Sequence, residues 1–196
     1  AVDPYFRADI ILGLSDLEGI AIEESYLTAT TLPGGLQARL GRFHMPIGKQ
    51  NTTHRSELMG EIEYPWVIQK FLGPEAGKGT GVSVSSIFAP LGFYQELQFT
   101  AVEQIPGGEE GAELTTELPS DGSAAGLGYS LRFRNYIDLS EASNLELSGS
   151  FATGRRPQPI ACDGLPACAG FDGVPGVNSR QSLVGGDLTF RWRPLQ

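Results

Sequence analysis

The stretch Leu127–Leu139, LGYSLRFRNYIDL, alternates between apolar and polar residues along nearly its whole length. Successive side chains of a β-strand point to opposite faces, so this period of two predicts a strand with one apolar and one polar face. The apolar register holds Leu127, Tyr129, Leu131, Phe133, Ile137 and Leu139, with Asn135 as its single break. The polar register holds Gly128, Ser130, Arg132, Arg134, Tyr136 and Asp138.

The same alternation recurs along most of the chain, and frequent glycine and proline disfavour helices of ordinary length. Near the end of the chain, Asp187, Thr189, Arg191 and Arg193 oppose an apolar register that includes Phe190 and Trp192. The pattern predicts about eight strands. They lie near residues 4–14, 19–32, 36–47, 79–89, 93–103, 125–140, 144–154 and 180–193. The adjacent acids Glu23 and Glu24 predict a bulge or register change in the second strand.

Composition limits the classes of partner and chemistry. The chain has 196 residues, and Lys+Arg 14 against Asp+Glu 23 gives a net charge of −9, which argues against nucleic acid as a partner. A membrane-spanning helix needs about 18 consecutive apolar residues, and no window of the sequence approaches that length. Gly73–Thr80 departs from the phosphate-binding loop, and no Gly-x-Ser-x-Gly motif frames a serine. We therefore expect neither an enzyme nor a cofactor.

Strand length and loop length favour a membrane barrel. Several predicted strands exceed the ~5–6 residues usual in soluble sheets and reach the about 9–11 that a tilted strand needs to cross a bilayer. Short connections near 32–35, 89–92 and 141–144 alternate with long ones near 48–78, 104–124 and 155–179. Outer-membrane barrels keep their short turns at the periplasmic end and their long loops outside. The expected fold is an all-β, antiparallel, up-and-down transmembrane β-barrel.

Aromatic residues near predicted strand ends fit the girdles that flank the apolar band of such barrels. They are Tyr5, Phe6, Phe93, Tyr94, Tyr136 and Trp192. The alternative is an antiparallel sandwich or a soluble barrel, because a period of two does not by itself tell a lipid-facing register from a core-facing one.

Several segments also resemble a known family. Residues 36–49, LQARLGRFHMPIGK, resemble a strand and its exit in bacterial outer-membrane porin-like barrels related to the phosphate-selective porins, including barrels labelled TonB-dependent outer-membrane receptors. Residues 63–73, EYPWVIQKFLG, and 77–82, GKGTGV, are similar to that family's first long loop and the start of its next strand. Residues 3–9 and 23–27 are similar to its preceding hairpin.

The resemblance implies a bacterial outer-membrane location, a lipid bilayer around the protein and more strands than about eight. Residues 1–196 are then a single β-barrel domain that is incomplete at one or both ends, because family members end on an aromatic residue and this chain ends at Gln196. A complete eight-stranded barrel is the alternative, with an interior filled by side chains. Neither a plug domain nor a TonB box is expected, so no TonB-dependent transport follows.

Charged residues in the polar registers are the expected lining of the barrel lumen. They are Arg39, Arg132, Arg134, Arg191, Arg193, Glu96, Asp138 and Asp187. Basic side chains around a pore attract anions. The acids on the same faces favour an interlaced charge network over a dedicated anion site, and the phosphate-binding residues of the resembling family have no matched positions here.

Metal ligands are sparse. His44 and His54 are the two histidines, and Glu57, Glu61 and Glu63 follow in the long connection. A zinc site needs three or four ligands in a supporting shell, so these are expected to be solvated loop residues and no metal is predicted. Cys162 and Cys168 are either a disulfide that closes a short external loop or two free thiols.

The function expected from these observations is a channel that passes small hydrophilic solutes passively through a polar lumen. The alternative is a non-conducting outer-membrane protein that binds partners through its long loops, with the acidic segment 107–113 and the cysteine loop as the contact surface. The sequence leaves open whether the protein forms a homo-oligomer or joins a larger membrane assembly.

Overall fold

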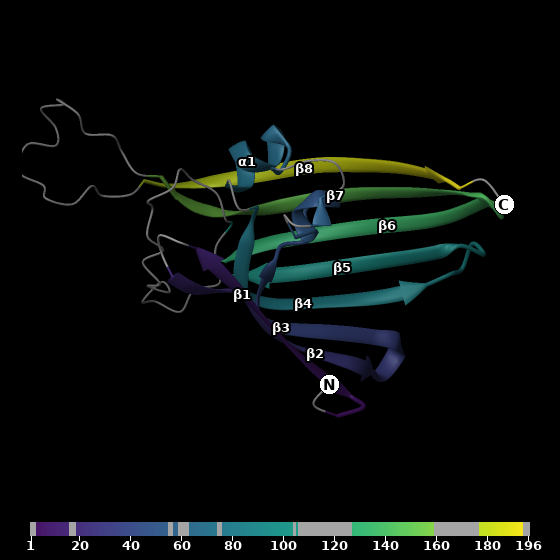
Figure 1. Cartoon of the computed structure of the whole chain (residues 1–196), viewed down its shortest axis with the longest axis horizontal. Coiled ribbons are helices and arrows are strands. Elements are labelled where there is room, and N and C mark those ends of the chain that lie inside the picture. Colours follow the sequence, from purple (N-terminus) through teal and green to yellow (C-terminus); the bar gives the residue numbers. More distant parts are fainter. Residues whose placement is uncertain are drawn as a thin grey trace, which may run out of the picture.

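The computed structural model describes residues 3–15, 19–54, 57–58, 63–73, 76–103, 105, 127–158 and 177–193. They form an 8-stranded antiparallel sheet in which each strand pairs with its neighbours in the chain, in the order β1 to β8 (Figure 1). The strands are β1 (Phe6–Ser15), β2 (Gly19–Leu32), β3 (Leu36–His44), β4 (Lys78–Phe88), β5 (Tyr94–Val102), β6 (Gly128–Ser140), β7 (Ser143–Gln158) and β8 (Val177–Trp192). The predicted all-β, up-and-down architecture is confirmed. Within the described residues β1 and β8 do not pair with each other, so the sheet is open.

The connections follow the predicted alternation of short and long. Residues 33–35, 89–93 and 141–142 join strands at one end of the sheet, and residues 45–77, 103–127 and 159–176 join strands at the other. The sequence did not predict the helix α1 (Trp66–Leu72), which lies in the connection between β3 and β4. Among the described residues, no helix has the length and apolar character needed to cross a bilayer.

The end of β3, the end of β7 and the start of β8 differ from the prediction for physical reasons. Strands β7 and β8 remain paired as far as Gln158 and Val177, because a continued antiparallel ladder gives backbone N–H and C=O groups hydrogen-bond partners. Strand β3 ends at His44 and not at residue 47. Pro46 lacks the N–H that a continuing ladder would need.

The predicted bulge lies in β2. Ile11 pairs with Glu24 and Leu12 pairs with Ile22, which leaves Glu23 as an extra residue without a partner in the ladder. A bulge changes the direction of the side chains around it. Glu23 and Glu24 therefore both reach the side of the sheet where residues 44–54 lie, as their contacts with His54 show.

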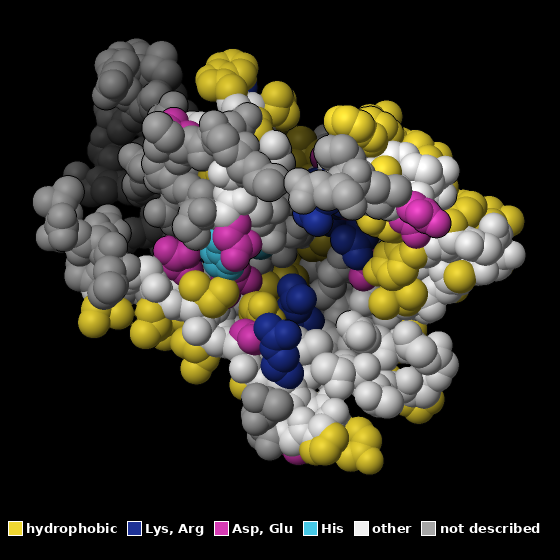
Figure 2. Space-filling view, turned by 45° about the vertical axis from the view of Figure 1, so that its right-hand side comes forward, with side chains coloured by type: hydrophobic (Ala, Val, Ile, Leu, Met, Phe, Trp, Pro, Cys, Tyr) yellow, Lys and Arg dark blue, Asp and Glu magenta, His cyan; other side chains and the backbone are white. Residues whose placement is uncertain are grey.

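The two faces of the sheet differ in polarity and in exposure. Leu131 is 44% exposed, whereas its neighbour Arg132 is 6% exposed. The exposed apolar face includes Leu40, Val82, Leu97, Phe99, Leu131, Phe133, Phe151, Val184, Leu188, Phe190 and Trp192. The buried polar side chains include Ser83, Thr100, Ser130, Arg132, Glu146, Ser148 and Ser150. Figure 2 shows Lys and Arg side chains in a central hollow and hydrophobic side chains along the margins.

Asn135, the polar residue that interrupts the apolar register of β6, makes a hydrogen bond within the sheet. Asn135 lies directly opposite Gln95 of β5, and the Gln95 amide nitrogen donates to Asn135 Oδ1 over 3.0 Å. Asn135 Oδ1 thus has a hydrogen-bond donor, as a polar group removed from water requires, whereas Gln95 Oε1 has no partner among the described residues.

A small apolar core lies on the polar side of the sheet, near the end where the long connections join the strands. Its members come from β3, β5, β7 and the connections beside them. They are Phe43, Met45, Ile47, Leu72, Val102, Ile105 and Ala152. This cluster packs the connection between β3 and β4 against the sheet, and the rest of that face remains polar.

Close strand packing at Gly41 gives a first prediction. Gly41 has φ +136°, and a Cβ there would overlap the carbonyl oxygen of Ser25 and the backbone of Tyr26. We expect Gly41→Ala to lower the free energy of unfolding in a urea titration by roughly 2 kcal/mol or more. Gly149→Ala is the control, because a Cβ at Gly149 meets nothing within 4 Å. Equal effects of the two substitutions would contradict this account.

Candidate functional site

A segment of the chain crosses the polar face of the sheet. Residues 45–54, here called the inserted segment, leave the end of β3 and reach β7 and β8 (Figure 1). The backbone N–H of Gly48 donates to Ser150 Oγ over 3.0 Å, and that of Lys49 donates to Asp187 Oδ1 over 3.1 Å. The inserted segment therefore bridges strands that lie four and five positions away from β3 in the sheet.

Lys49 anchors the tip of the inserted segment. Its ammonium nitrogen lies 2.6 Å from Glu146 Oε2 and donates to Thr189 Oγ1 over 3.1 Å. The Glu146 side chain is 8% exposed and that of Lys49 is 29% exposed, so the ion pair is partly shielded from water. A partly buried charge-assisted hydrogen bond is stronger than an exposed one.

Asn51 holds the two ends of the β3–β4 connection together. Its side chain is completely buried. Its amide nitrogen donates to the carbonyls of Met45 and Gly77, at 2.7 and 3.0 Å, and its Oδ1 accepts from the backbone N–H of Gly77 at 2.7 Å. One side chain thus pairs both backbone groups of Gly77 and fixes the path of the inserted segment.

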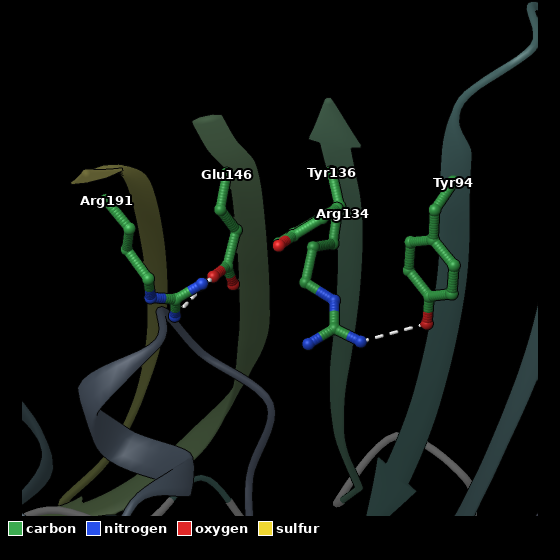
Figure 3. Close-up of a pocket in the computed structure, with 5 residues that line it drawn as sticks. All are labelled: Tyr94, Arg134, Tyr136, Glu146 and Arg191. Atoms are coloured by element: carbon green, nitrogen blue, oxygen red, sulfur yellow. Dashed lines mark hydrogen bonds and ion pairs between the residues drawn. The ribbon is translucent and has the colours of Figure 1, made fainter. Parts of the chain in front are cut away.

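A pocket of about 370 Å³ lies between β5 and β8 (Figure 3). Its lining is Tyr94, Arg134, Tyr136, Glu146 and Arg191. These residues come from the polar register of four adjacent strands, near the end of the sheet with short connections. The wall therefore offers guanidinium, carboxylate and phenol groups to whatever enters.

The charges around the pocket are paired with one another. Arg134 lies 2.6 Å from Glu96 and donates to the Tyr94 hydroxyl over 3.0 Å. Arg191 lies 3.2 Å from Glu146, the carboxylate that also holds Lys49. The pairing forms an interlaced charge network, in which each arginine that lines the pocket makes an ion pair with a glutamate.

The network continues deeper along the polar face. Arg132 donates to Ser148 Oγ over 3.4 Å, and Ser148 Oγ donates to Asp187 Oδ2 over 2.9 Å. Asp187 also accepts the backbone N–H of Lys49. Arg132, Arg134, Arg191, Glu96 and Asp187, all predicted from the sequence, are thus brought together on one face.

Other predicted lining residues lie elsewhere. The Arg39 guanidinium lies 4.4 Å from the centroid of the Tyr26 ring and 5.7 Å from that of Phe43, a cation–π arrangement on β2 and β3 outside the pocket. Asp138 and Arg193 are exposed near the turn between β6 and β7, where the Arg193 N–H donates to Ala142. Cys162, Cys168 and the acidic segment 107–113 lie outside the described residues.

The structure also adds residues that the sequence prediction missed. Tyr94 and Tyr136 were expected in an interfacial girdle, but they line the pocket, because both fall in the polar register of their strands. Glu146 has the same register signal in β7 and could have been found from it. Lys49 and Asn51 had no such signal, because residues in a loop show no regular alternation of apolar and polar side chains. Their contacts with other parts of the chain therefore could not be predicted from the sequence pattern.

No family of known proteins matches the chain, and no solved structure matches it. An uncharacterised protein of Aquifex aeolicus (strain VF5) is 31% identical over 120 residues, which cover 60% of this chain and 25% of that protein. The aligned part of the chain therefore spans about a quarter of that relative's length.

The role of Asn51 can be tested by limited proteolysis. Asn51→Ala leaves the backbone N–H of Gly77 buried without its partner, and such a group costs about 1–3 kcal/mol. The carbonyls of Met45 and Gly77 each lose one of two donors and keep the N–H groups of Ile47 and Met45. We expect cleavage between residues 45 and 77 to become at least about tenfold faster. Gln50→Ala, at an exposed neighbouring position, is the control and should be cleaved like the unmodified protein.

Proposed function

We propose that this chain forms part of the wall of a bacterial outer-membrane β-barrel, which passes small hydrophilic solutes through a polar lumen narrowed by the inserted segment. The observation that carries the proposal is the polarity of the sheet. Its apolar side chains are exposed and its polar side chains are buried. In a barrel wall the apolar face contacts lipid tails and the polar face lines an interior.

A water-soluble function fits this polarity less well. A soluble antiparallel sheet packs its apolar face on a core and turns its polar face to solvent. Here a wide exposed apolar patch would favour aggregation in water. Strand length supports the membrane as well, since β2, β6 and β7 have 14, 13 and 16 residues and a tilted transmembrane strand needs about 9–11.

The proposal requires further pairing at β1 and β8. Lipid cannot satisfy the free N–H and C=O groups of a sheet edge, so a membrane barrel must be closed. Strands beyond this stretch of sequence or strands of another copy would supply the pairing. The resemblance to porin-like barrels with more strands agrees with the first of these.

The lumen chemistry supports passive passage of polar solutes without a dedicated anion site. The pocket arginines are paired with Glu96 and Glu146, so their charge is largely balanced locally. The inserted segment, held by Lys49 at Glu146, lies across the same face and would set the width of the opening. Passage would then depend on solute size and on the field of the paired charges.

Lipid exposure predicts a depth-dependent effect of charge on β6. Leu131 lies within the strand and Leu139 near its end, and both side chains are exposed on the apolar face. After folding into lipid vesicles, Leu131→Arg should lower the free energy of unfolding by roughly 2 kcal/mol or more, and Leu139→Arg by about 0–1 kcal/mol. Equal costs at the two positions would be evidence against a lipid-facing sheet.

The channel itself is tested by conductance of the full-length protein in planar bilayers. Lys49→Met removes the ion pair with Glu146 that holds the inserted segment, so we expect a larger or noisier single-channel conductance. Lys70→Met, on the exposed side of α1, is the matched control and should conduct like the unmodified protein. If the unmodified protein shows no conductance, the channel proposal fails and the non-conducting, partner-binding alternative takes its place.

A further inference from the structure

Three potential metal ligands meet beside the inserted segment, away from the charged pocket. Glu24 comes from β2, His44 ends β3 and His54 ends the inserted segment. Glu24 Oε1 lies 2.7 Å from His54 Nε2 and 3.6 Å from His44 Nε2. One ligand atom from each of the three residues lies within 4.8 Å of the other two. Figure 2 shows histidine between acidic side chains on this face.

His44 is the least satisfied member of this group. Its side chain is 4% exposed, and neither ring nitrogen makes a hydrogen bond with a described residue. Glu24 Oε1 lies 3.6 Å from His44 Nε2, which is beyond hydrogen-bond distance. A buried polar group without a partner is costly, so its retention calls for an explanation such as a bound ion.

The bulge in β2 explains why the site has acidic character. Because Glu23 is the extra residue, its carboxylate and that of Glu24 both turn toward His54, at 4.0 Å and 2.7 Å. Lys78 is the cation nearby, with Nζ 3.8 Å from Glu23 Oε2. Glu23 thus faces Lys78, whereas Glu24 faces both histidines.

We propose that Glu24, His44 and His54 bind a divalent transition-metal ion of the zinc class. Two imidazoles and one carboxylate are a donor set that suits Zn²⁺ and its neighbours in the first transition row, whereas Ca²⁺ and Mg²⁺ prefer oxygen donors alone. Bonds of about 2.0–2.1 Å at the tetrahedral angle separate ligand atoms by about 3.3 Å. The observed 2.7 and 3.6 Å lie on either side of that value.

The bound ion would join β2, β3 and the inserted segment at one point. The sequence offered Glu57, Glu61 and Glu63 as partners of the histidines, and no metal was expected from them. The ligand that completes the group is Glu24, which lies far upstream and is oriented by the bulge. The site would hold its ion whether or not the sheet lies in a membrane, so this inference does not rest on the proposed function.

The test is calorimetric titration of the untagged, folded protein with Zn²⁺ alone. We expect about one Zn²⁺ ion per chain and no competition from Ca²⁺. Zn²⁺ binding should be at least about tenfold weaker in Glu24→Gln and in His54→Gln, because even residues outside the ligand shell alter metal affinity by about 10–100-fold. Glu57→Gln, which removes an exposed carboxylate three residues from His54, is the control and should bind Zn²⁺ with unchanged affinity.

The outcomes separate clearly. Absence of Zn²⁺ binding by the unmodified protein would overturn the proposal. So would variants at Glu24 and His54 that bind Zn²⁺ as tightly as the unmodified protein. A loss of Zn²⁺ affinity in Glu57→Gln as large as that in the Glu24 and His54 variants would overturn it as well. Circular dichroism establishes that each variant keeps its β-sheet. His54→Gln changes a loop position that is 26% exposed, so it carries the test even if the buried Glu24→Gln variant does not fold.

Discussion

The arrangement of this molecule depends on the polarity of its sheet, which is the reverse of that in a soluble antiparallel sheet. Its apolar face is largely exposed, and many side chains of its polar face are buried. The start of the inserted segment, Met45 and Ile47, packs in the apolar cluster, whereas its continuation over the polar face is held by hydrogen-bond donors and acceptors. Gly48 and Lys49 bind to Ser150, Glu146 and Asp187 of β7 and β8. Asn51 binds to Met45 and Gly77 at the two ends of the connection. Each of these polar groups would be costly if it were buried alone.

The faces and most strand positions could be predicted from the sequence, because a period of two is a local signal. Leu131 and Arg132 fall on the expected faces, and the bulge at Glu23 was visible as two adjacent acids. The positions of Lys49, Asn51 and α1 could not be predicted in this way. Their contacts join residues far apart in the chain, and no periodicity within a loop encodes them. The tyrosines of the pocket lie near strand ends, and their polar register explains why they line it.

The polar side of the sheet is divided along the strand direction. Near the long connections, an apolar cluster around Phe43 and Met45 adjoins the group of Glu24, His44 and His54. Near the short connections, arginines, acids and tyrosines surround an open pocket. The inserted segment spans both zones, with His54 at one and Lys49 at the other. One short stretch of chain is therefore the physical link between the two candidate sites.

The reach of Lys49 also has a consequence for how the chain assembles. Neighbouring strands form hairpins from local contacts, but Lys49 meets Thr189, which lies 140 positions later in the sequence. Closing so long a loop carries an entropic cost and is slow compared with hairpin formation. The final position of the inserted segment therefore requires β7 and β8 as partners, and the contacts that fix it are among the longest-range ones of this part of the chain.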